Sequence, residues 1–171
     1  DSFTVKVYSS SGKVIMYSMA AFTSNVDTSP KIKANNPQQV SIDYSKYYSG
    51  RFLYNTKGID SNATVNFSLQ NLFGEDYSNY LNIYKNIVAN NKTNPSVSII
   101  PLPLGEYKLI ASYGSARSDE ISVKVGPYDY VIYYYANDGT NTKTGRYYKK
   151  NTSLTIISSP FTKTGYTFKA W

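Results

Sequence analysis

The chain has 171 residues, with 41% hydrophobic and 16% aromatic side chains, 19 tyrosines, a net charge of +7, and neither cysteine nor histidine. This content excludes a disordered chain, and the missing cysteine and histidine exclude disulfides, thiolate nucleophiles, the usual proton shuttle and the commonest metal ligand. The positive charge favours anionic partners, and the alternative reading is that dispersed lysines keep a tyrosine-rich surface soluble.

The first part of the chain is expected to form β-strands. Residues 3–8 alternate apolar and polar side chains, residues 9–12 form a Gly-containing turn, and residues 13–22 return as the second strand of a hairpin. Residues 24–37 are polar and carry two prolines, which indicates a loop or a sheet edge. Three further strands are expected at residues 40–44, 51–54 and 63–69.

A helix is expected near residues 75–90. Glu75 and Asp76 at its start suit the positive end of a helix dipole, and we interpret them as solvated acids. Asn90 is a plausible stop. The apolar positions are spaced by three and four, which is typical of one helix face, and they are Tyr77, Tyr80, Leu81, Tyr84, Ile87 and Val88.

The pattern returns to strands at residues 96–100, 106–113 and 121–125. The last two of these resemble the final hairpin of an immunoglobulin-like bacterial surface module. Gly126-Pro127 follows directly and indicates a domain boundary. We therefore expect a mainly β chain whose residues 1–126 form an immunoglobulin-like β-sandwich with one inserted helix.

The carboxy-terminal part carries a more specific motif, formed by residues 130–139 (YVIYYYANDG) and 163–171 (KTGYTFKAW). These segments resemble one Listeria-Bacteroides repeat, the repeat of internalin B type, although Asp138 and Ala170 stand where that family usually has glycine. The resemblance implies that residues 128–171 form a small β-grasp (ubiquitin-like) module of a bacterial cell-surface protein.

The alternation along residues 130–135 predicts one inward face and one outward face. Tyr130, Ile132 and Tyr134 are expected to point inward, where side chains such as Tyr166 and Phe168 can pack on them. The outward face, together with a basic segment, is the candidate binding surface, because tyrosine rings stack on sugars and tolerate water. Its candidate residues are Tyr133, Tyr135, Arg146, Tyr147, Lys149 and Lys150.

Catalysis is not expected, because the neighbouring acid pairs Glu75-Asp76 and Asp119-Glu120 do not suggest two carboxylates held across a cleft. The favoured function is a non-catalytic structural spacer or adhesin segment, in an extracellular, cell-wall or cell-surface setting and within a longer polypeptide. The alternative is a carbohydrate- or wall-polymer-binding module, as an appendage of a larger secreted enzyme. Expected partners are a host-surface protein or glycan, or an anionic cell-wall polymer. Nucleic acid, a metal and a cofactor are not expected. A membrane span is not expected either, because no run of ~20 apolar residues is present.

Overall fold

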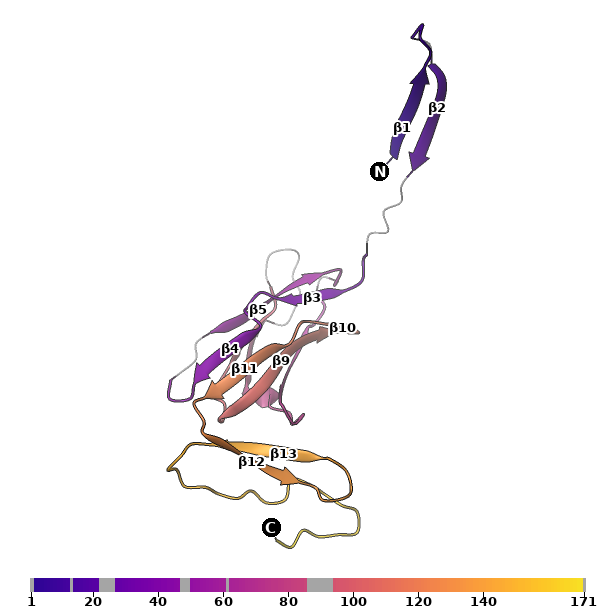
Figure 1. Cartoon of the computed structure of the whole chain (residues 1–171). Coiled ribbons are helices and arrows are strands. Elements are labelled where there is room, and N and C mark those ends of the chain that lie inside the picture. The colour runs from indigo at the N-terminus through magenta and orange to yellow at the C-terminus, as the bar shows by residue number, and fades with distance from the viewer. Residues whose placement is uncertain are drawn as a thin grey trace.

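The computed structural model describes residues 2–12, 14–21, 27–46, 50–60, 62–85 and 94–170, and it is mainly β, with several sheets (Figure 1). Strands β1 (Ser2–Tyr8) and β2 (Val14–Ala21) pair in antiparallel register, which confirms the hairpin expected from the alternation. Its turn is closed by Gly12, which has φ 78° and donates its N–H to the Ser9 carbonyl at 2.9 Å. A positive φ of this kind favours glycine.

Two sheets form the central body of the molecule. The first has the order β3-β5-β8-β7 with antiparallel pairs, and its strands are β3 (Lys31–Ala34), β5 (Arg51–Lys57), β8 (Ser96–Ile99) and β7 (Leu81–Lys85). In the second, β9 (Gly105–Tyr113) pairs with β6 (Asn66–Asn71) along one edge and with β10 (Ala116–Arg117) and β11 (Ile121–Gly126) along the other. Strand β4 (Gln39–Asp43) continues this sheet by pairing with β11 in parallel.

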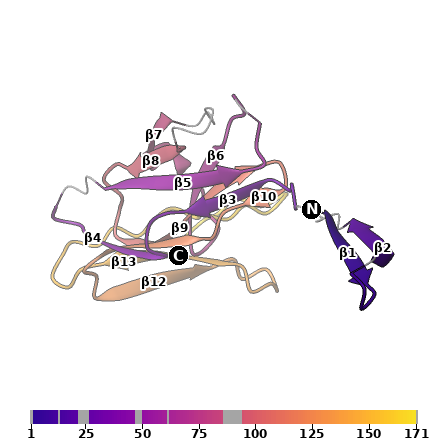
Figure 2. The ribbon, with the colours of Figure 1, turned by 90° about the horizontal axis from the view of Figure 1, so that it is seen from above.

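The two sheets enclose one hydrophobic core. In Figure 2, β5 and β8 lie on one side of this body and β4 and β9 on the other. Alternate residues of β5 and β11 point inward, as the period-two pattern predicts, whereas all four residues of β8 are buried. The most deeply buried core residues include Phe52, Tyr54, Val97, Leu69, Leu109, Ile121 and Val123.

The expected helix near residues 75–90 is wrong over its described part. Residues Ser78–Tyr80 form one short 3-10 turn, η1, and Leu81–Lys85 form strand β7; residues 86–90 lie outside the described residues. A bulge between Ile83 and Lys85 shifts the register of β7 against β8. Of the residues whose spacing suggested a helix, Tyr77 precedes the 3-10 turn, Tyr80 lies in it, and only Leu81 and Tyr84 lie in β7, so the helical spacing runs across separate elements. No helix among the described residues has the length and apolar character needed to cross a membrane.

The carboxy-terminal part contains the hairpin of β12 (Tyr130–Tyr135) and β13 (Lys143–Tyr148), which pairs Tyr133 with Gly145. Asn137 and Gly139 in its loop have φ 52° and 86°, positive values that asparagine and glycine adopt more readily than other residues. Residues 149–170 form no helix or strand. Tyr166 is 73% exposed, so it does not pack inward as expected.

Candidate functional site

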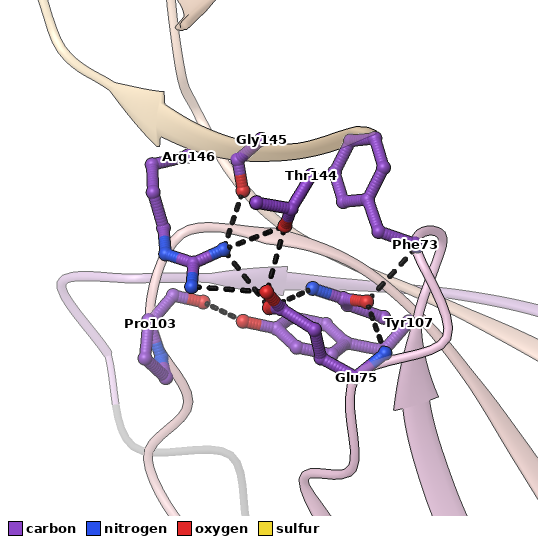
Figure 3. Close-up of polar contacts among 8 residues, drawn as sticks. Phe73, Glu75, Pro103, Tyr107, Thr144, Gly145 and Arg146 are labelled. Carbon is purple, nitrogen blue, oxygen red and sulfur yellow. Dashed lines mark hydrogen bonds and ion pairs between the residues drawn. The ribbon is translucent and has the colours of Figure 1, made fainter. Parts of the chain in front are cut away.

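The loop that follows β6 is shaped by a single asparagine. The side-chain Oδ1 of Asn71 accepts hydrogen bonds from the backbone N–H groups of Phe73 and Glu75, both at 2.9 Å. Gly74 completes the turn with φ 81°. This capping by the asparagine side chain directs the Phe73 ring and the Glu75 carboxylate toward β13 (Figure 3).

The carboxylate of Glu75 joins the sandwich to the carboxy-terminal hairpin. Arg146 donates from Nη1 to Oε2 at 2.9 Å and from Nη2 to Oε1 at 3.1 Å, which is a two-pronged ion pair (Figure 3). The Thr144 hydroxyl donates to Oε1 and the Asn71 amide to Oε2, each at 2.7 Å. Both charged side chains are less than one third exposed. Paired charge-assisted bonds of this geometry are stronger than neutral ones and fix direction as well as distance.

These contacts decide the ionisation of Glu75. Partial burial acts to raise its pKa, but the hydrogen bonds from Arg146 and Thr144, the charge of Arg146 and the bond from Asn71 outweigh burial, so the pKa of Glu75 is lowered. The pKa of Arg146 is raised: burial opposes its charge, and Glu75 more than compensates. The pair is therefore ionised at neutral pH.

An aromatic contact lies beside the ion pair. The Phe73 ring meets the Tyr133 ring edge to face, with centroids 6.0 Å apart. It also covers Gly145, where an added Cβ would lie 2.7 Å from Phe73 Cζ and 3.1 Å from Val131 Cγ1. Glycine is needed at this position because a larger residue leaves no room for the ring.

A second group of contacts joins the two parts near the end of β11. The Tyr128 hydroxyl donates to the Glu106 carboxylate, and Lys124 lies 3.6 Å from that carboxylate and 4.9 Å from the centre of the Tyr128 ring. The Tyr128 and Tyr147 rings meet edge to face at 4.6 Å. Burial, followed by the bond to Glu106, raises the pKa of Tyr128 to about 12. We name these contacts, with those of Phe73, Glu75 and Arg146, the junction.

The structure divides the six residues of the predicted binding surface. Arg146 and Tyr147 belong to the junction, and Lys149 lies over the ring of Tyr44, which follows β4, at 5.5 Å. Each of these three side chains therefore contacts the sandwich or the residues leading out of it. The prediction grouped Arg146 with the outward-facing residues. This is wrong, because Arg146 bonds to Glu75.

The other three predicted residues keep accessible side chains, and Tyr133 also meets the Phe73 ring of the junction. Tyr133 is 49% and Tyr135 56% exposed, as the outward face predicted. Lys143 approaches both rings, at 5.1 Å and 5.9 Å from their centres. Lys150 is exposed, and its backbone N–H donates to Asp129 at 2.6 Å. Whether these residues bind a ligand stays a prediction.

A cavity of about 250 Å³ lies between the sandwich and β13, beside the ion pair. Five tyrosines from both parts of the molecule line it, together with Arg146. These tyrosines are Tyr44, Tyr77, Tyr107, Tyr147 and Tyr148.

Sequence reasoning missed the junction residues on the sandwich side. Glu75 was interpreted as a solvated acid at a helix start, whereas it accepts four side-chain hydrogen bonds. The available signal was Asn71 followed by Gly74, since an asparagine shortly before a glycine indicates a turn. Nothing in the sequence pairs that turn with Thr144 and Arg146.

No family model matches the chain, and a search of curated proteins gave no significant match. No group of three or more acidic side chains that could hold a metal ion occurs within the ranges that the structure describes. The junction itself contains a hydrogen-bonded ion pair and an aromatic contact between two parts of one chain.

Proposed function

We propose that this chain is a non-catalytic structural segment of a bacterial cell-surface protein, in which an immunoglobulin-like sandwich and a repeat module are held in one fixed orientation. The observation that carries the proposal is the two-pronged pair of Glu75 and Arg146 across the junction. A spacer or adhesin must present its ends at defined positions, and a rigid junction provides this.

The strand order supports the immunoglobulin-like assignment. The order β3-β5-β8-β7 corresponds to strands A-B-E-D of that fold, and β6, β9 and β11 correspond to C, F and G. Near the start of β9, the Tyr107 hydroxyl donates to the Pro103 carbonyl at 2.9 Å. A tyrosine at the start of strand F that bonds to the backbone a few residues upstream is a hallmark of immunoglobulin-like sandwiches.

The repeat assignment is supported by the motif residues and by the hairpin between them. Under it, β12 and β13 are the first hairpin of a β-grasp module, and Asn137 and Gly139 are its turn residues. The bacterial cell-surface setting follows from the resemblance to Listeria-Bacteroides repeats. The net charge of +7 suits a protein that lies close to anionic wall polymers.

Fixed orientation is the mechanical part of the proposal. Domains within one chain move relative to each other unless their interface is extensive. Here two separate groups of contacts, around Glu75 and around Glu106, join the same two parts, and the Phe73 ring fills the space over Gly145. Contacts at two separated points oppose rotation as well as translation.

The test is a distance measurement by pulsed electron paramagnetic resonance. The chain has no cysteine, so nitroxide labels at Lys57→Cys in β5 and Lys150→Cys after β13 are the only ones attached. Both positions are exposed. We expect one narrow distance distribution, which broadens in Arg146→Ala and stays narrow in Glu120→Gln, a variant of the exposed Lys108–Glu120 pair. A broad distribution in the otherwise unaltered chain would contradict the proposal.

A further inference from the structure

The cavity between the sandwich and β13 has the composition of a ligand site. Its tyrosines come from separate segments: Tyr44 follows β4, Tyr77 precedes η1, Tyr107 lies in β9, and Tyr147 and Tyr148 lie in β13. Ring faces and edges thus surround one small space from several directions. The Tyr77 and Tyr107 rings meet edge to face at 5.0 Å, so this wall is already ordered.

Some tyrosine hydroxyls in the cavity wall have no hydrogen-bond partner within the described part of the chain. The Tyr107 hydroxyl donates to Pro103, whereas the hydroxyls of Tyr77 and Tyr147 have no hydrogen-bond partner among the residues that the structure describes. Burial raises the pKa of Tyr77, and it raises that of Tyr147 to about 12. Both hydroxyls therefore stay protonated at neutral pH and can donate as well as accept.

The charge of the wall is balanced. Arg146 directs both terminal nitrogens at Glu75, and Nη1 also donates to Thr144 at 3.1 Å and to the Gly145 carbonyl at 2.8 Å. Lys149, which lies over the Tyr44 ring, and Glu106, which follows the lining residue Gly105, are not part of the wall. A charged ligand would have to compete with an ion pair that is already complete, so the cavity suits an uncharged ligand.

Size limits the ligand to one ring. The volume of about 250 Å³ is below the ~300–1,000 Å³ of sites for drug-sized molecules. Aromatic walls with a few hydroxyl groups match a sugar, whose C–H faces pack on rings and whose hydroxyls exchange hydrogen bonds. We propose that this cavity binds a single uncharged pyranose unit, either free or at the end of a glycan. The proposal goes beyond the structural role, and it rests on the fixed junction because both parts of the molecule line the cavity.

The test is a titration of the isotope-labelled full chain, followed by NMR. The probes are the methyl glycosides of glucose, galactose, mannose, N-acetylglucosamine and N-acetylgalactosamine, and a disaccharide ending in each sugar. We expect at least one to shift the signals of Tyr107 and Gly105, with a dissociation constant on the order of 1 mM. If a disaccharide binds at least as tightly as its terminal monosaccharide, the ligand is the end of a glycan. If the disaccharide binds more weakly, the ligand is the free sugar.

Conservative variants test the location. Tyr77→Phe and Tyr147→Phe keep the rings and each remove one hydroxyl, so each should weaken binding by about three- to tenfold. Tyr135→Phe, on the exposed face of β12, should leave binding unchanged. Thermal unfolding curves of all three variants verify that the fold is retained.

The proposal is overturned if none of the probes shifts the signals of the cavity residues, or if binding survives both cavity variants and is lost in Tyr135→Ala. The spin-label distances report the junction separately, so a rigid junction with no sugar binding removes this inference and leaves the structural role in place.

Discussion

Arg146 in β13 and Glu75 in the loop after β6 form a two-pronged ion pair across 71 residues of sequence, with N···O distances of 2.9 and 3.1 Å. Thr144 and Asn71 donate two further bonds to the same carboxylate. Removing either charged partner leaves the other partly buried without its counter-charge. The stability of the junction therefore depends on the pair as a unit.

Arg146→Ala should lower the free energy of unfolding by about 1–2 kcal/mol, because partly buried Glu75 loses its charged partner. Urea unfolding followed by circular dichroism measures the change. The matched control is Glu120→Gln, which breaks the exposed pair with Lys108 and should cost no more than about 0.5 kcal/mol. Equal effects of the two variants would show that the junction pair contributes no more than a surface pair.

Acid should weaken the junction through Glu75. Its folded pKa lies below the ordinary 4.5, so its stabilising contribution is fully present above pH 4.5 and is lost as the pH falls through the folded pKa. Glu75→Gln should be less stable than the unaltered chain at pH 7, and the difference should shrink toward pH 3. Urea midpoints of both proteins at each pH provide the measurement. Exposed carboxylates with lowered pKa, such as Asp27, occur in both proteins and cancel in the comparison. A difference that stays constant with pH would argue against the ionised pair.

Tyr54→Phe should leave stability unchanged or raise it by up to about 1 kcal/mol. The Tyr54 hydroxyl is fully buried in the sandwich core and has no hydrogen-bond partner among the described residues, and burial raises its pKa. A buried hydroxyl without a partner loses its water and gains nothing in return. The matched variant is Tyr107→Phe, which loses the bond to Pro103 and should cost about 1 kcal/mol. Thermal unfolding of both distinguishes them, and a clear loss in Tyr54→Phe would reveal a partner for its hydroxyl.

Gly145→Ala should destabilise the junction by about 1–3 kcal/mol, because the new Cβ would lie 2.7 Å from Phe73 Cζ. The cost should fall when Phe73→Ala is introduced as well, since the smaller side chain frees the space. A double-mutant cycle by urea unfolding measures this coupling. If the cost is the same in both backgrounds, the clash with Phe73 is not its cause.

Local patterns predicted many of the strands. The hairpin of β1 and β2, which forms a sheet of its own, and the strands β4, β5, β6, β8, β9 and β11 all follow from alternation and turn residues within short windows. Strand β7 did not, because its register shift at Ile83 is set by pairing with β8. Strand β3 lies at the edge of its sheet, within a polar segment that was expected to be a loop or an edge.

The candidate site, like the fold, was predicted only in part from the sequence. The sequence by itself determined that residues 130–135 are a tyrosine-rich strand with Tyr133 and Tyr135 outward, because side chains alternate along any strand. It also determined that cysteine and histidine chemistry is absent from the chain. Only the tertiary structure decided that Arg146 faces Glu75 instead of solvent, and that tyrosines from distant segments surround one cavity. The physical reason is that a strand's own pattern specifies which way a side chain points, whereas its partner depends on how separately folded parts of the chain pack together.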